Sequence, residues 1–181
     1  WCNSLFEDNA EDVLGMRLAV DANREQLKIY IDKLFALGTS AELKSAIEKS
    51  LELWKESSEE ANDAQKAVKA ALPGAIAAAK SDEERKLLGK IDELKDYFAD
   101  KVIFIIGGDG WAYDIGFGCV DHVLASGRNV NILVLDTEVY SNTGGQASKS
   151  TPIAAVAKFA NAGKEIGKKN MGFMAMTYGH A

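Results

Sequence analysis

An aspartate and a threonine follow two strongly apolar runs of this sequence, and their side-chain oxygens are suitable ligands for Mg²⁺. Asp109 lies in a glycine-rich turn after the run 102–106, and Thr137 follows the run 130–135. If both runs are parallel strands, their carboxyl ends meet at one edge of a sheet, where α/β proteins bind ligands. The Asp109 carboxylate, the Thr137 hydroxyl and the Val139 carbonyl, two residues further along an extended chain, are oxygen ligands that suit Mg²⁺. We therefore predict a magnesium site there.

The glycine-rich turn around Asp109 also indicates a bound phosphate. Glycines let the backbone approach a ligand closely, and the following helix can direct its amide groups at an anion. The aspartate would repel a bare phosphate, but a cation between the two removes that conflict. Asp136 is a competing ligand, although strand alternation turns it away from Thr137. Both the glycine–aspartate turn and the loop 140–145 are also compatible with plain turns.

The elements expected to position these residues alternate between strand and helix in the second half of the chain. An apolar, β-branched run such as 102–106 is typical of a parallel strand buried on both faces. The alternation predicts an α/β fold with a doubly wound, mostly parallel sheet. Its expected elements are strands at 102–106, 130–135 and 171–177 and helices near 113–126 and 153–163.

Residues 1–100 are expected to be mainly helical. Apolar residues recur at helical spacing, two capping signatures (Thr39 with Glu42, Ser81 with Glu84) open helices, and Pro73 interrupts one. The apolar positions are Leu27, Tyr30, Ile31, Leu34, Leu37, Leu43, Ile47, Leu51, Trp54, Leu87, Leu88, Ile91, Leu94 and Phe98. They either pack on one another or bind a partner helix, and the former is the simpler interpretation. We treat residues 1–181 as one domain, with this helical region preceding a cofactor-binding part.

Composition excludes several classes of protein. The chain is 47% hydrophobic and 27% charged, has no apolar run of membrane-spanning length and lacks a signal peptide. Residues 102–181 carry six basic and six acidic side chains, so the net charge of −6 lies in the first part and does not favour nucleic acid. Two isolated cysteines, Cys2 and Cys119, suggest a cytoplasmic protein and cannot hold an iron–sulfur cluster. The missing initiator methionine suggests a piece of a longer protein.

The segments around the predicted ligands resemble pyruvate:ferredoxin (or flavodoxin) oxidoreductases. The similarity is densest in residues 107–116 and 135–146. Shorter similar blocks are 3–11, 121–127, 157–159 and 176–179, so the resemblance spans nearly the whole chain, most loosely over 39–100. Cys119, where the family usually has glycine, and His180, where an aromatic residue is usual, are departures. The resemblance implies the thiamine-diphosphate-binding domain of such an enzyme.

The resemblance also implies roles for individual residues. Asp109, Thr137 and the Val139 carbonyl would bind Mg²⁺, and Asn142 would be the active-site asparagine, steadying the pyruvate carboxylate or a developing negative oxygen. Contacts with thiamine diphosphate are implied for Gly108, Asp109, Gly110, Trp111, Thr137, Glu138, Val139, Tyr140, Ser141 and Asn142.

The implied reaction converts pyruvate and coenzyme A to acetyl-coenzyme A and carbon dioxide. Electrons would pass through [4Fe–4S] clusters, whose ligands lie outside this segment, to ferredoxin or flavodoxin. The segment is expected to need other domains of the same chain, to be inactive in isolation, and to belong to a homodimer as the full-length protein. A sister oxidoreductase acting on another 2-oxo acid and a non-catalytic helical interaction module remain the alternatives. Lys164, Lys168 and Lys169 are interpreted as a solvated helix end, with attraction of an acidic electron carrier as the alternative.

Overall fold

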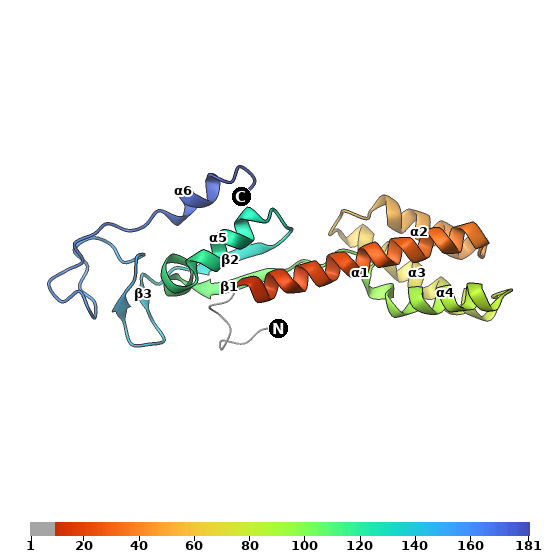
Figure 1. Ribbon diagram of the computed structural model, residues 1–181, viewed down its shortest axis with the longest axis horizontal. Coiled ribbons are helices and arrows are strands. Elements are labelled where there is room, and N and C mark those ends of the chain that lie inside the picture. The colour runs from red at the N-terminus through yellow and green to blue at the C-terminus, as the bar shows by residue number, and fades with distance from the viewer. Residues whose placement is uncertain (1–9) are drawn as a thin grey trace. The chain divides into compact units, whose positions relative to one another are not determined.

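The computed structural model describes residues 10–181, so Cys2 and most of the block 3–11 lie outside the described part (Figure 1). The chain forms two compact units. One comprises residues 18–102, and the other joins residues 10–17 to residues 103–181. The helices of residues 10–181 include none that combines the length and apolar character needed to cross a membrane.

The unit of residues 18–102 is helical, as the apolar spacing predicts. It contains most of α1 (Ala10–Leu37), then α2 (Ala41–Glu52), α3 (Glu59–Ala77), α4 (Asp82–Glu93) and a 3₁₀ turn at Lys95–Tyr97. The apolar stripes of these helices form one core, which includes Leu27, Ile31, Leu34, Leu43, Ile47, Val68, Leu72, Leu88, Ile91 and Phe98. The helices therefore pack on one another, as the simpler interpretation predicts.

Local signals set most helix ends in this unit. Gly38 follows α1 with a φ of +90°, a conformation that glycine adopts without strain, and its amide bonds to Leu34. Ser81 caps α4 as predicted, because its hydroxyl accepts a hydrogen bond from the Glu84 amide at 3.1 Å. The predicted cap at Thr39 is wrong by one residue, since Ser40 accepts from the Leu43 amide instead.

Pro73 does not interrupt a helix, contrary to the prediction. α3 continues through it to Ala77. Pro73 is exposed, while Val68, Leu72 and Ala75 on the same helix are buried. The buried apolar face outweighs the lost backbone hydrogen bond, because packing supplies most helix stability in proteins.

A buried arginine, Arg24, links several segments of the helical unit. Its side chain is 5% exposed. The guanidinium donates hydrogen bonds to the carbonyls of Tyr97 (2.8 Å) and Trp54, lies 4.0 Å above the Trp54 ring and is 3.9 Å from Asp100. One buried cation thus ties α1 to the chain on both sides of α3 and α4.

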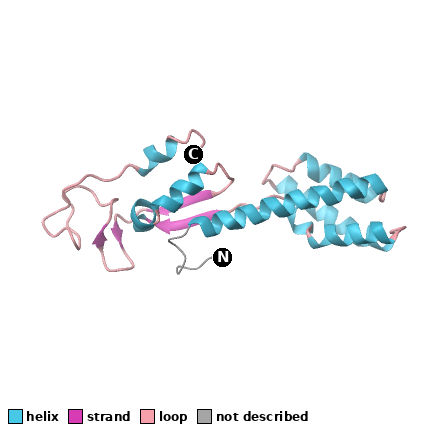
Figure 2. Ribbon diagram, viewed as in Figure 1, coloured by secondary structure: helices cyan, strands magenta, loops and turns pink. Residues whose placement is uncertain are grey.

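The second unit contains the predicted β-α-β arrangement. Strand β1 (Phe104–Gly108) pairs in parallel with β2 (Asn131–Leu135), with Phe104 opposite Asn131 and Gly108 opposite Leu135. A π-helical turn (Gly110–Ile115) and α5 (Phe117–Ala125) connect them. Figure 2 shows α5 beside the two strands. The core of this unit includes Ile105, Trp111, Ala112, Val120 and Val123.

The prediction that β1 is buried on both faces is wrong. Phe104 and Ile106 are 56% and 55% exposed, whereas Ile105 between them is buried. The strand also begins at Phe104, two residues later than predicted. One face of the pair is covered by helix, and the other carries apolar side chains without a covering layer among the described residues.

A doubly wound sheet is not present in residues 10–181. The only other sheet there is the antiparallel pair of β3 (Val139–Tyr140) and β4 (Gln146–Ala147). The fold is mixed α/β and mostly helical. The predicted strand 171–177 is instead helix α6 (Met171–Met176), capped by the Asn170 side chain, which accepts from the Phe173 amide at 2.9 Å. Methionine and alanine favour helix, and residues 171–176 include no β-branched residue that would favour a strand.

The predicted alanine-rich helix at 153–163 is also absent. Ala154 and Phe159 have positive φ angles of 65° and 66°, which no α-helix contains. The segment pairs with Lys164 instead, since the Ala154 amide bonds to the Lys164 carbonyl at 2.8 Å. The apolar side chains here are exposed, so a helix would have no buried face to stabilise it.

Candidate functional site

The three predicted magnesium ligands come together at the ends of β1 and β2. Asp109 directly follows β1, and Thr137 and Val139 follow β2. The Thr137 hydroxyl oxygen lies 3.0 Å from Asp109 Oδ1 and 3.2 Å from the Val139 carbonyl oxygen. Parallel pairing explains the encounter, because Gly108 and Leu135 are register partners and both strands end at the same level.

These oxygen–oxygen distances match the spacing of neighbouring ligands around Mg²⁺. Octahedral ligands about 2.1 Å from the ion are about 3.0 Å from each other. The three atoms are a carboxylate, a hydroxyl and a carbonyl oxygen. Among the described residues, no three His, Cys, Asp or Glu side chains gather as a metal-binding set. A cation at the strand ends would therefore need this mixed oxygen set and further oxygens from a ligand or water.

Asp109 is buried and is held by neutral groups. Its side chain is 1% exposed. Oδ2 accepts a hydrogen bond from the Ser148 hydroxyl at 2.5 Å, and Oδ1 faces Thr137. Both partners are neutral hydroxyls, so neither supplies the positive charge that a buried carboxylate needs. The arrangement suits a bound cation.

The neighbouring carboxylate, Asp136, is engaged differently. It accepts hydrogen bonds from Tyr113 Oη (3.0 Å) and from the Ser150 hydroxyl, and it lies 2.8 Å from Lys168 Nζ. Burial acts to raise the pKa of Asp136, but the Lys168 ammonium and the two hydroxyls outweigh it and hold that pKa below its ordinary value. The same ion pair raises the pKa of Lys168. Asp136 is thus already neutralised by the protein.

The glycines of the turn make room for aromatic rings. A Cβ added to Gly107 would lie 2.7 Å from Trp111 Cδ2, and one added to Gly110 would lie 2.8 Å from Tyr140 Cζ. Gly108 is different, since an added Cβ would meet nothing within 4 Å. Trp111 is buried, and within the described part of the chain its Nε1 has no hydrogen-bond partner. Gly107 and Gly110 are therefore packed against aromatic rings, whereas the space beside Gly108 is open.

Comparison with known proteins identifies a set of large redox enzymes. The chain is 54% identical to the pyruvate:ferredoxin oxidoreductase of Moorella thermoacetica over 180 residues, which is 99% of this chain and 15% of that protein. It is 51% identical to the pyruvate-flavodoxin oxidoreductase of Klebsiella pneumoniae over 180 residues and 49% identical to that of Rhodospirillum rubrum over 181 residues. No family model matches.

The chain is homologous to a segment of pyruvate oxidoreductases. It spans about 15% of the length of the curated relatives it matches. The resemblance inferred from the motifs is confirmed at this level, and these relatives are enzymes. The role of this segment in binding thiamine diphosphate stays a prediction.

The remaining positions predicted to contact the cofactor follow β2. Glu138 has a φ of +65°, unusual for a residue with a side chain, and its carboxylate lies 3.2 Å from Lys168 Nζ. Ser141 Oγ lies 2.8 Å from Thr137 Oγ1, next to the three predicted ligands. Asn142 is exposed in the turn after β3, and within the described residues it makes no hydrogen bond to these ligands. The structure therefore joins Ser141 to the site and leaves Asn142 facing solvent.

Sequence reasoning missed the residues that hold the two strand ends together. Ser148, Ser150 and Thr151 are all buried. Their hydroxyls donate to Asp109, to Asp136 and to the Glu138 carbonyl, respectively. The sequence predicts no regular element between residue 140 and Pro152, only a polar loop. The available signal was the run of three hydroxyl residues around Lys149, close in sequence to the predicted ligands.

The three lysines interpreted as a solvated helix end contact the site. Lys168 pairs with Asp136 and Glu138, Lys164 donates to the Thr151 carbonyl at 2.5 Å, and Lys169 donates to the Tyr113 carbonyl at 3.1 Å. No helix forms over residues 163–170. Burial lowers the pKa of Lys169, and Lys149 lowers it further. Lys168 thus ties this segment to the residues after β2, and Lys169 ties it to the π-helical turn.

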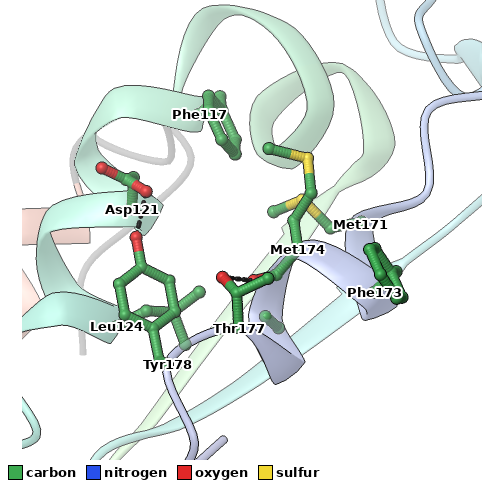
Figure 3. A pocket seen from close by; sticks show the side chains of 9 residues that line it. Phe117, Asp121, Leu124, Met171, Phe173, Met174, Thr177 and Tyr178 are labelled. Carbon is green, nitrogen blue, oxygen red and sulfur yellow. Dashed lines mark hydrogen bonds between the residues drawn. The ribbon is translucent and has the colours of Figure 1, made fainter.

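A separate cavity of about 200 Å³ lies between α5 and α6 (Figure 3). Phe117 and Leu124 from α5 and Met171 from α6 are among its apolar walls. Its carboxylate, Asp121, already accepts a hydrogen bond from Tyr178, which raises the pKa of that tyrosine. None of the predicted ligands lines this cavity, so the strand ends remain the better candidate for chemistry.

Proposed function

We propose that the ends of β1 and β2 hold a Mg²⁺ ion through Asp109, Thr137 and the Val139 carbonyl, and that this ion binds the diphosphate of thiamine diphosphate. The observation that carries the proposal is that the Thr137 hydroxyl oxygen lies 3.0 Å from Asp109 Oδ1 and 3.2 Å from the Val139 carbonyl oxygen. The neutral partners of Asp109 support it, because they leave a negative charge for the cation. The open backbone at Gly108 leaves room for a ligand beside the strand end.

The proposed enzyme is a pyruvate:ferredoxin or pyruvate:flavodoxin oxidoreductase, of which this chain forms one part. It would convert pyruvate and coenzyme A to acetyl-coenzyme A and carbon dioxide. Thiamine diphosphate, when bound, supplies the carbanion chemistry by which 2-oxo acids lose carbon dioxide. Asn142, which faces solvent here, would orient the carboxylate of pyruvate through its amide once the rest of the enzyme encloses the site.

Electron transfer and assembly belong to the rest of the proposed enzyme. Iron–sulfur clusters of the [4Fe–4S] type would be bound by cysteines elsewhere, because four thiolates are needed and this chain has two cysteines. The clusters would pass electrons to ferredoxin or flavodoxin. We propose a cytoplasmic homodimer whose other domains complete the cofactor site, so the isolated segment would be inactive.

Calorimetry on the full-length enzyme tests the cofactor proposal. Thiamine diphosphate would be titrated with Mg²⁺ present and with the ion chelated. Two isosteric variants test the ligands. Asp109→Asn replaces the carboxylate by a neutral amide, and Thr137→Val replaces the hydroxyl by a methyl group. Loss of an outer partner of a metal site costs about 10–100-fold in affinity, so each direct ligand should cost at least that much.

The control is Asp121→Asn, which removes a carboxylate of the same unit that lies on α5 beside the separate cavity. It should bind the cofactor as tightly as the wild type. Cofactor binding that ignores Mg²⁺, or that survives unchanged in Asp109→Asn, would overturn the proposal. Activity measured with pyruvate and with larger 2-oxo acids tests the substrate, and a clear preference for a larger acid would replace pyruvate in the assignment.

A further inference from the structure

Residues 148–151 form a short crossing segment, here called the hydroxyl strap, that joins the two strand ends. Ser148 donates to the Asp109 carboxylate after β1 at 2.5 Å. Ser150 donates to the Asp136 carboxylate, and Thr151 donates to the Glu138 carbonyl, both after β2. The three side chains are 4%, 0% and 1% exposed. The strap therefore meets both sides of the proposed cation site from within the protein.

Hydrogen bonds within the strap determine which way its hydroxyls point. Ser148 Oγ accepts from the Ser150 amide at 3.1 Å, and Thr151 Oγ1 accepts from the Ser148 amide at 2.9 Å. A hydroxyl that accepts one bond keeps a single proton to donate elsewhere. That proton goes to Asp109 from Ser148 and to the Glu138 carbonyl from Thr151. Both donors are thus oriented by the strap itself.

The strap holds the two features that set the ligand geometry. Ser148 occupies Oδ2 of Asp109, which leaves Oδ1 toward Thr137. Thr151 holds the peptide after Glu138, whose φ of +65° lies in the left-handed region. That peptide links Glu138 to Val139 and so fixes the backbone immediately before the Val139 carbonyl, which lies 3.2 Å from the Thr137 hydroxyl.

We propose that Ser148 and Thr151 are positioning residues that hold the carboxylate of Asp109 and the carbonyl of Val139 at the spacing a small divalent cation requires. This inference rests on the proposed function, because it concerns the same cation. The strap uses neutral donors on Asp109, whereas Asp136 meets the Lys168 ammonium. Within the strap, Ser148 and Ser150 thus give each aspartate a neutral donor, and only Asp136 also meets an ammonium, that of Lys168 outside the strap.

The decisive experiment compares two ions in the full-length enzyme. Mg²⁺ demands near-octahedral ligands at about 2.1 Å, while Ca²⁺ accepts longer and irregular bonds. If the strap sets the cage, Ser148→Ala and Thr151→Val should weaken Mg²⁺-dependent binding of thiamine diphosphate by about 10–100-fold. Binding supported by Ca²⁺ should change several-fold less. A purely structural role would weaken binding with both ions alike.

Matched variants make the test specific. Thr151→Ser keeps the hydroxyl and should bind like the wild type, whereas the isosteric Thr151→Val should not. Ser126→Ala removes a comparable hydroxyl bond, to the Val123 carbonyl at the end of α5, and should leave binding unchanged. If Ser148→Ala fails to fold, the Thr151 pair still decides.

Two results separate this inference from the proposed function. A wild-type enzyme that binds the cofactor without any divalent ion would overturn the proposed function and the strap with it. The strap alone would be overturned if the wild type requires Mg²⁺ but the Ser148→Ala and Thr151→Val variants keep wild-type affinity for the cofactor. It would also be overturned if these variants lose cofactor binding equally with Mg²⁺ and with Ca²⁺.

Discussion

Replacing Gly107 by alanine should destabilise the unit that carries the proposed cation site. An added Cβ would lie 2.7 Å from Cδ2 of Trp111 and 3.0 Å from Cζ3. Carbon atoms in contact prefer about 3.5–4.0 Å, so the overlap is about 1 Å. Trp111 is 4% exposed, and on another side a Cβ at Gly116 would lie 2.7 Å from its Nε1. The ring has little space to move away.

Overpacking of this kind costs about 1–3 kcal/mol, and we expect the upper part of that range because the indole is confined. Gly108 provides the matched control, since it is the next residue of β1 and a Cβ there would meet nothing within 4 Å. Gly108→Ala should change stability by no more than about 0.5 kcal/mol. The two single-methyl changes should thus differ by about 2 kcal/mol or more.

Native-state hydrogen exchange read by mass spectrometry is the suitable assay, because it reports the opening free energy of each unit separately. Peptides from β1, α5 and β2 should show the difference, and peptides from α2 to α4 should not. Equal protection of β1 in the Gly107→Ala and Gly108→Ala variants would refute the argument from ring confinement.

Two further predictions concern the helical unit. Arg24→Met should lower the free energy of unfolding of residues 18–102 by about 3 kcal/mol or more in urea titrations, because it removes the buried donor to the Tyr97 and Trp54 carbonyls and the cation beside Asp100. A loss below about 1 kcal/mol would contradict this. Lys69 lowers the pKa of Asp96 through a hydrogen bond on the surface. The folded-state pKa is depressed, so the pair stabilises the fold above the ordinary aspartate pKa of about 4 and ceases to do so as the pH falls through the lowered value. Asp96→Asn should therefore cost about 0.5 kcal/mol in thermal unfolding at pH 7 and progressively less in acid, and a cost that grows in acid would reverse the sign of the argument.

Much of this fold follows from local patterns. The stripe Leu27, Ile31 and Leu34 is buried as its spacing predicts, and Ser81 caps α4 as its position relative to Glu84 predicts. Such signals are read within a few residues, so no distant partner is needed. The meeting of Asp109 and Thr137 was also predictable, because parallel strands in a β-α-β unit end at the same edge.

Other parts depended on partners distant in sequence. A short apolar run such as 171–177 suits either a strand or a buried helix, and its strand form would need a neighbour that the described residues do not supply. The segment 153–163 lost its expected helix to pairing with the chain around Lys164. In both places the local pattern was compatible with two structures.

The sequence by itself determined the helical stripes, the β-α-β unit and the identity of the three candidate ligands, because each depends on periodicity or on the order of elements along the chain. Only the tertiary structure decided that the hydroxyls of residues 148–151 hold the ligands in place. The Ser148–Asp109 bond joins residues 39 positions apart. No local sequence pattern predicts a bond of that span, because it forms only after the loop has folded back over both strand ends.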